Sequence, residues 1–119
     1  MTTASRDLRQ TDEIKLNRLA NQDGVIAVSA FYEGFPVQSV GKADFEHIAA
    51  LAEDLMRAGA KIAEEMEIGP LNQMILETPE NKIIVAPCGD LFLCVFTTSG
   101  VNLGLVRILL KSIQSDNTG

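Results

Sequence analysis

The segment after Asp44 constrains the fold more than any other part of the sequence. Up to the Ile68-Gly69-Pro70 sequence, apolar residues recur at alternating intervals of three and four, which predicts one long amphipathic helix. Asp44 suits the N-cap, and we expect Gly69 to take the left-handed conformation that ends the helix before Pro70. At about 100° per residue the apolar arc is roughly 200° wide, twice what packs a helix on one core.

This apolar arc divides by side-chain size. The bulky half comprises Ile48, Leu51, Leu55, Ile62 and Met66. The small half comprises Ala49, Ala52, Met56, Gly59, Ala60 and Ala63. We expect the bulky half to fill the space over a sheet and the small half to accept the same helix of a second copy. A mid-helix glycine costs up to about 1 kcal/mol against alanine, so Gly59 is best explained by something that packs on it. The alternative is that the small half packs against a loop or terminus of its own chain.

The remaining elements complete a single α+β domain over residues 1–119. Predicted strands span residues 25–31, 36–40, 71–78, 82–87 and 91–97, and flanking helices run from an N-cap at Thr11 to Gly24 and over residues 102–115. The order α-β-β-α-β-β-β-α predicts a five-stranded antiparallel sheet with helices on both faces. We expect an ordered core at about residues 11–115 between mobile polar termini, with Leu8 as a further residue of the first helix.

Strand composition predicts positions within the sheet. Segments 25–31 and 91–97 are apolar on both faces, as in central strands, whereas 37–40 and 71–78 alternate and belong nearer an edge. The segment 71–78 has no proline, lysine or other protection before Glu77. It could therefore pair with its own copy across a two-fold axis. The residues of this expected dimer contact are Leu71, Asn72, Gln73, Met74, Ile75 and Leu76.

The charge balance excludes several partners. Ten Lys and Arg against sixteen Asp and Glu give a net charge of −6, which argues against general affinity for nucleic acid or anionic membranes. No apolar run approaches the roughly 20 residues that span a bilayer, and the polar N-terminus lacks a signal-peptide pattern. We expect a cytoplasmic protein without membrane insertion.

The sequence offers no catalytic or cofactor-binding constellation. Cys88 and Cys94 flank a Gly89-Asp90 turn that places their thiols out of register on opposite faces, so we expect no disulfide. A single histidine, His47, on the polar side of the long helix predicts neither a zinc site nor a general base. No Walker loop or Gly-x-Ser-x-Gly motif occurs. The expected protein is not an enzyme and carries no cofactor or metal.

Several short segments in order resemble the Roadblock-type family, over about residues 16–114. They are Gly24-Val25-Ile26-Ala27-Val28-Ser29, Glu33-Gly34-Phe35-Pro36-Val37, Ala49-Ala50-Leu51-Ala52, Gly89-Asp90-Leu91-Phe92-Leu93 and Asn102-Leu103-Gly104-Leu105-Val106-Arg107. The resemblance implies the same element order. It also implies a homodimer with one continuous sheet through the copies of segment 71–78, and with the two long helices side by side.

The same resemblance implies a function. Members of the family are typically scaffolds or regulators of GTPases, and prokaryotic relatives partner Ras-like GTPases. The expected role is a non-catalytic homodimeric adaptor that binds a small Ras-like GTPase, with regulation of its nucleotide cycle, including activation, as a further hypothesis. The alternative is a small-ligand sensor module, which needs a sheet–helix pocket of at least about 300 Å³ lined by convergent polar groups.

Overall fold

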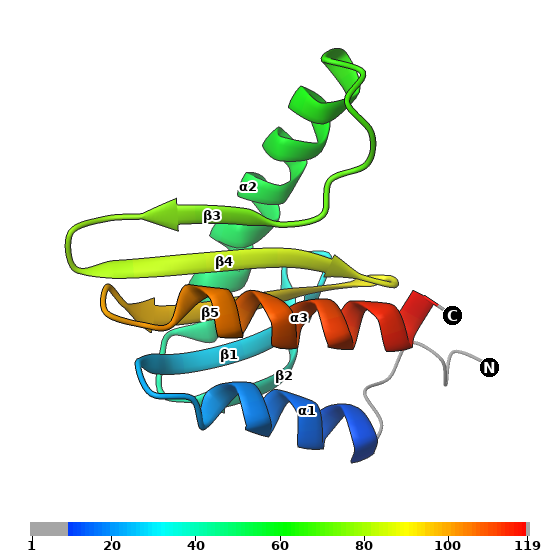
Figure 1. Cartoon of the computed structure of the whole chain (residues 1–119). Coiled ribbons are helices and arrows are strands. Elements are labelled where there is room, and N and C mark those ends of the chain that lie inside the picture. Colours follow the sequence, from blue (N-terminus) through cyan, green and yellow to red (C-terminus); the bar gives the residue numbers. More distant parts are fainter. Residues whose placement is uncertain (1–9, 119) are drawn as a thin grey trace.

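The computed structural model describes the backbone of residues 10–118 and the side chains of residues 13–115. The elements follow the predicted order (Figure 1). They are α1 (Gln10–Ala20), β1 (Val25–Tyr32), β2 (Phe35–Gly41), α2 (Phe45–Glu65), β3 (Met74–Glu77), β4 (Asn81–Cys88), β5 (Leu91–Thr98) and α3 (Leu103–Thr118).

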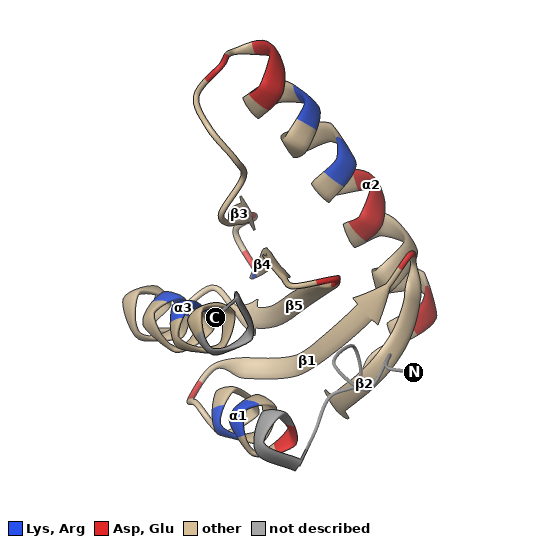
Figure 2. Ribbon diagram, turned by 90° about the vertical axis from the view of Figure 1, so that its right-hand side faces the viewer, with Lys and Arg blue, Asp and Glu red and all other residues tan. Residues whose placement is uncertain are grey.

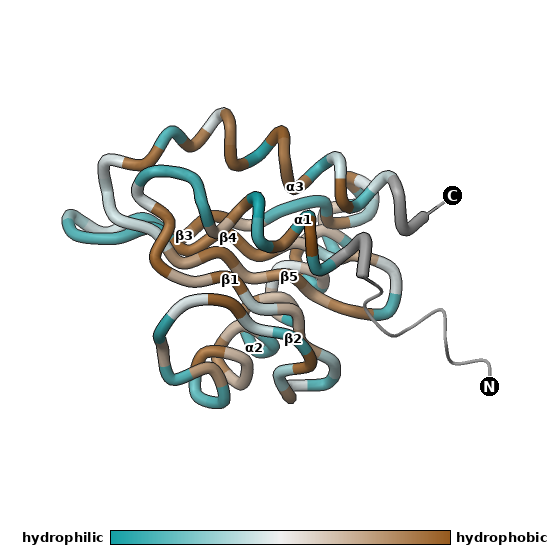
Figure 3. The backbone as a smooth tube through the Cα atoms, turned by 90° about the horizontal axis from the view of Figure 1, so that it is seen from below, coloured by the Kyte–Doolittle hydropathy of each residue, from teal (hydrophilic) through white to brown (hydrophobic). Residues whose placement is uncertain are grey.

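The strands form one antiparallel sheet in the order β2-β1-β5-β4-β3. The apolar strands β1 and β5 are interior, and the alternating strands β2 and β3 are the edges, as their composition predicts. Helices α1 and α3 cover one face of the sheet and α2 crosses the other (Figure 3). The predicted α+β architecture with helices on both faces is therefore confirmed.

The turn between β4 and β5 sets the register of the two cysteines. Cys88 pairs with Leu91 and Val85 pairs with Cys94, as a two-residue turn at Gly89-Asp90 requires. Cys88 belongs to the core under α1 and α3, whereas Cys94 belongs to the core under α2. Both cysteines are buried and neither is in a disulfide, as predicted.

Helix α2 begins as predicted but ends earlier. The Asp44 carboxylate accepts a hydrogen bond from the His47 backbone N–H at 3.2 Å, which confirms the N-cap. The left-handed residue that ends the helix is Glu67, with φ of 55°, and not Gly69. The N–H of Ile68 donates to the Ala63 carbonyl at 3.2 Å, which completes the usual closing hydrogen bond as soon as Glu67 turns. Gly69, with φ of 97°, then lies in the linker to β3.

Two further boundaries differ from the prediction. Thr11 lies inside α1 rather than capping it, and α1 ends at Ala20 rather than Gly24; Leu8 lies outside the described residues. Strand β3 is shorter than the predicted 71–78 because the preceding residues are held elsewhere. Leu71 packs against the core under α2, and Gln73 hydrogen-bonds to α3, so residues 71–73 do not join the ladder.

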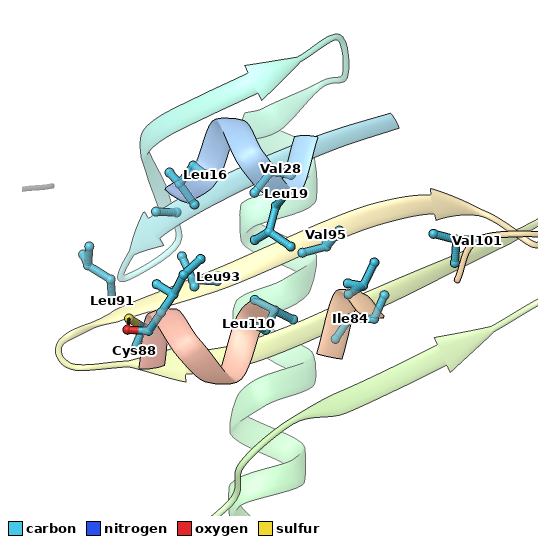
Figure 4. Close-up of a cluster of buried hydrophobic side chains, with 13 residues drawn as sticks. Leu16, Leu19, Val28, Ile84, Cys88, Leu91, Leu93, Val95, Val101 and Leu110 are labelled. Carbon is cyan, nitrogen blue, oxygen red and sulfur yellow. Dashed lines mark hydrogen bonds between the residues drawn. The ribbon is translucent and has the colours of Figure 1, made fainter. Parts of the chain in front are cut away.

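The two faces of the sheet have separate cores. The larger core lies under α1 and α3 and includes Leu16, Leu19, Val28, Leu93 and Leu110, all less than 2 % exposed (Figure 4). The smaller core lies under α2 and consists of Phe31, Ala49, Ala52, Met56, Val85 and Cys94. The α2 face is thus the less completely covered one.

Candidate protein-interaction surface

The side of α2 that faces the sheet is the reverse of the prediction. The small residues Ala49, Ala52, Met56, Gly59 and Ala63 are buried against the chain's own sheet. The bulky residues Leu51, Ile62 and Met66 are 54 %, 55 % and 63 % exposed. The expectation that the small half is left for a second copy is therefore wrong, and of the bulky half Ile48 and Leu55 alone pack against the core under α2 as expected. Of the small half, Ala60 alone is exposed.

Close approach between α2 and β3 explains the reversal. A Cβ atom at Gly59 would collide with the thioether sulfur of Met74 and would lie 3.2 Å from Leu71 Cδ2. The atoms that approach Gly59 belong to the side chains of Met74 and Leu71, so the glycine leaves room beneath α2 for these two side chains. The alternative of packing within the same chain thus explains Gly59, and the packing partners are the edge strand and its linker.

Four of the bulky residues of α2 form an apolar stripe that is mostly exposed, which we define as Leu51, Leu55, Ile62 and Met66. Leu55 is partly buried beside the smaller core, and the other three are exposed. Figures 1 and 2 show that the C-terminal end of α2 runs past the β3 edge of the sheet and has no strand of its own chain beneath it. The apolar stripe therefore continues beyond the sheet that the chain supplies.

Strand β3 provides an open edge beside this stripe. It pairs with β4 on one side and is the last strand of the sheet on the other. Leu76 lies opposite Ile83, shares the α2 face of the sheet with Met74, and is 49 % exposed. The strand contains no proline or lysine that would hinder a further strand. The predicted unprotected edge is confirmed, with bounds Met74–Glu77.

The charged groups on α2 form surface pairs rather than a reactive site. The Arg57 guanidinium lies 3.3 Å from the Glu53 carboxylate and 3.5 Å from that of Asp54. His47 is exposed, and its backbone N–H serves the helix cap. Burial raises the pKa of the Cys94 thiol from 9.0 to about 12, so the thiol is protonated at neutral pH. No cluster of three His, Cys, Asp or Glu residues occurs within the described part of the chain.

A groove of about 620 Å³ lies on the other side of α2 from the stripe. It is lined by Glu53, Met56, Arg57, Ala60, Ala63, Glu64, Glu67, Gly69, Pro70, Leu71, Pro87 and Phe92. The groove meets the size expected for the small-ligand alternative. Its polar groups do not converge, because Arg57 pairs with Glu53 and the other two glutamates are exposed. One buried oxygen, Glu53 Oε1, has no hydrogen-bond partner among the described side chains, and a single such group does not make the convergent polar set that a ligand sensor needs.

The described residues contain no helix of sufficient length and apolarity to traverse a bilayer.

Comparisons with solved structures agree with this fold. A Roadblock/LC7 domain protein from Streptomyces avermitilis superposes with a TM-score of 0.76 at 17% identity, over 89% of this chain and 97% of that chain. MglB from Myxococcus xanthus superposes with a TM-score of 0.80 at 20% identity, over 92% of each chain. The gliding protein MglB from Thermus thermophilus gives 0.77 at 14% identity, over 86% and 82%.

Sequence comparisons extend to relatives with higher identity. The uncharacterized protein MJ0310 from Methanocaldococcus jannaschii is 31% identical over 105 residues, which cover 88% of this chain and 85% of the relative. A second uncharacterized protein of that organism, MJ0714, is 30% identical over 105 residues, or 88% and 82%. The Roadblock/LC7 domain family model matches residues 8–97. The chain therefore belongs to the Roadblock/LC7 domain family.

Proposed function

We propose that this protein is a non-catalytic homodimeric adaptor that binds and regulates a small Ras-like GTPase. The observation that carries the dimer is the continuity between the open edge of β3 and the exposed apolar stripe of α2. One two-fold axis beside β3 would join the two copies of this strand and place the overhanging end of α2 above the sheet of the second copy. Both unfinished surfaces are completed by this one operation.

The energetic argument rests on the stripe. Burial of a Leu, Ile or Met side chain contributes about 1.5–3 kcal/mol relative to full exposure, and Leu51, Ile62 and Met66 are each more than half exposed. Of the sequence-predicted contact, Met74, Ile75 and Leu76 lie in β3 and remain in the proposal as the segment at the axis, whereas Leu71, Asn72 and Gln73 are held by their own chain. The buried residues Ala49, Ala52, Met56, Gly59 and Ala63 support α2 from behind, and Ala60 faces the groove.

Family membership supports the GTPase partner. The Roadblock-type resemblance implies scaffolding and GTPase regulation, and two of the structural neighbours are MglB proteins, one of them described as a gliding protein. The acidic surface of α2, with paired rather than reactive side chains, is consistent with a binding role. The proposal also includes acceleration of GTP hydrolysis by the partner, which a separate measurement of hydrolysis rates tests.

Sedimentation equilibrium tests the dimer. We expect a dimer at about 10 μM chain for the unmodified protein and a monomer for Ile62→Glu, because a carboxylate in the stripe would be desolvated on association. Helical content by circular dichroism should be unchanged, since Ile62 is 55 % exposed in the single chain. The matched control is Lys61→Glu on the exposed polar side, which should remain dimeric. A monomeric unmodified protein at 100 μM would refute the dimer.

Calorimetric titration tests the partner. The probes are the Ras-like GTPases encoded in the same genome, each loaded with GDP or with a non-hydrolysable GTP analogue. We expect binding to at least one of them, tighter for one nucleotide state. Failure of every GTPase in both states would refute the GTPase part and leave the dimer standing. Single-turnover GTP hydrolysis with and without the protein then measures activation.

A further inference from the structure

A hydrogen-bonded chain of side chains joins α3 to the linker before β3, on the sheet face opposite α2. Arg107 Nε donates to Gln73 Oε1 at 3.2 Å, and Gln73 Nε2 donates to Gln114 Oε1 at 3.4 Å. Gln114 Nε2 in turn donates to the carbonyls of Asn72 at 3.1 Å and Pro87 at 2.7 Å. The orientation of the Arg107 guanidinium is therefore fixed by its Nε, and its two terminal nitrogens are left for another acceptor.

The surface around this chain is hollowed. One hollow of about 400 Å³ is lined by Asn72, Gln73, Gly104, Arg107, Ile108 and Lys111. A second of about 400 Å³ is lined by Asn72, Pro87, Gly89, Lys111, Gln114 and Ser115. They share Asn72 and Lys111 and so form one continuous surface, which we call the α3 surface. Ile108 is 66 % exposed there and supplies an apolar contact between the cations.

The α3 surface is basic in an acidic protein. The net charge of the chain is −6, yet α3 has Arg107 and Lys111 and no acidic residue from Leu103 to Ser115 (Figure 2). Neither cation has an acidic partner among the side chains that the structure describes, whereas Arg57 on α2 lies between Glu53 and Asp54. The positive charge on α3 is thus available to a partner, and that on α2 is neutralised locally.

We propose that the α3 surface binds an acidic peptide segment of a partner protein. Such a segment would place one carboxylate on the fixed guanidinium of Arg107, a second near Lys111 one turn along α3, and an apolar side chain on Ile108. A guanidinium held by its Nε presents the planar pair of donors that matches a carboxylate. A polyanion such as nucleic acid or an anionic membrane is a poorer match, because the surface offers two cations beside one apolar residue rather than an extended run of basic residues. This inference does not rest on the proposed dimer or GTPase.

Titration of ¹⁵N-labelled protein tests the proposal. The probe is a synthetic decapeptide of alternating Glu and Leu, added up to millimolar concentration at low salt. We expect chemical-shift changes at the Arg107 Nε–H, at the side-chain amides of Gln73 and Gln114, and at the backbone of Ile108. A peptide in which Ser replaces Leu should bind at least 3-fold more weakly, because it lacks the apolar contact with Ile108. Absence of shifts on α3, or an unchanged affinity of the Ser peptide, would overturn the proposal.

Charge reversal supplies the matched variants. Lys111→Glu breaks no hydrogen bond of the network and should lower the affinity for the Glu-Leu peptide at least 5-fold. The double variant R107E/K111E should lower this affinity further. Lys61→Glu on α2 makes the same charge change and should leave the affinity within 2-fold. An equal loss of peptide affinity in Lys61→Glu and Lys111→Glu would show that only the net charge matters, and it would overturn the proposed site. Shifts on α3 with inorganic polyphosphate or phosphatidylserine vesicles, but not with the acidic peptide, would also overturn it.

Discussion

The two faces of the sheet are covered in different ways. On one face, α1 and α3 lie side by side and enclose a core of leucine, isoleucine and valine. On the other, α2 alone crosses the sheet, buries mainly alanine, glycine and methionine, and leaves Leu51, Ile62 and Met66 exposed. One helix that runs past the edge of a five-stranded sheet cannot cover it. The chain therefore covers one face of its sheet fully and the other only in part, and the following predictions test that contrast.

The largest effect is expected in the completed layer. Leu110 on α3 is fully buried, so Leu110→Ala should lower the free energy of unfolding by about 3 kcal/mol through lost burial and the cavity that remains. Urea denaturation measures the change. Ile108→Ala, two residues earlier and 66 % exposed, should change stability by less than about 0.5 kcal/mol. A similar loss of unfolding free energy in both variants would show that Leu110 does not lie on the buried side of α3 and Ile108 on the exposed side.

A smaller loss is expected where α2 meets the edge strand. Gly59→Leu should lower the free energy of unfolding by about 1–3 kcal/mol, because its side chain must displace Met74 and Leu71. Ala60→Leu, its exposed neighbour, is the control and should be nearly neutral. Denaturation at two protein concentrations separates this effect from association. If the loss of stability in Gly59→Leu disappears at low protein concentration, Gly59 lies in a contact between subunits instead.

The pH dependence of stability tests whether the core under α2 excludes water. The pKa of the Cys94 thiol is raised from 9.0 to about 12, so the folded chain keeps this proton when the unfolded chain loses it. The contribution of Cys94 to stability is complete below pH 9 and is lost as the pH rises toward 12. At pH 10 the loss is about 1.4 kcal/mol relative to pH 8.

Cys94→Ala is the reference for this measurement, and the comparison uses urea denaturation of both proteins at pH 8 and pH 10. Other titrating groups act equally in the two proteins and cancel in the difference. An identical pH dependence with and without the Cys94 thiol would indicate that water reaches the α2 layer.

The smallest effect concerns the end of α2 beyond the sheet. Glu67 adopts φ of 55°, a conformation that disfavours a side chain, so Glu67→Gly should raise the free energy of unfolding by about 0.5–1 kcal/mol. Glu65→Gly, within the last turn of α2, should instead lower it by up to about 1 kcal/mol. Thermal denaturation measures both. A loss with Glu67→Gly would argue against the left-handed helix end.

Local chemistry made much of the fold predictable from the residues. The Asp44 cap, the Gly89-Asp90 turn and the register of the two cysteines depend on neighbours a few positions away. The Asn102 cap is of the same kind, since its side-chain oxygen accepts from the Leu105 N–H at 3.1 Å. The positions of strands in the sheet follow from which of them are apolar on both faces. These features need only short-range geometry and a period of two or 3.6.

Only the tertiary structure decided which side of α2 faces the sheet. An apolar arc of roughly 200° has two candidate faces, and periodicity alone assigns neither. The side that faces the sheet is the one where the Met74 side chain lies beneath Gly59. This contact joins a residue of α2 to a residue of β3, so the periodicity of the helix does not reveal it. The α3 surface is a similar case, because Gln73 and Gln114 are 41 positions apart and meet only when the linker docks on α3. Periodicity determines which residues share a face, and three-dimensional packing determines what that face meets.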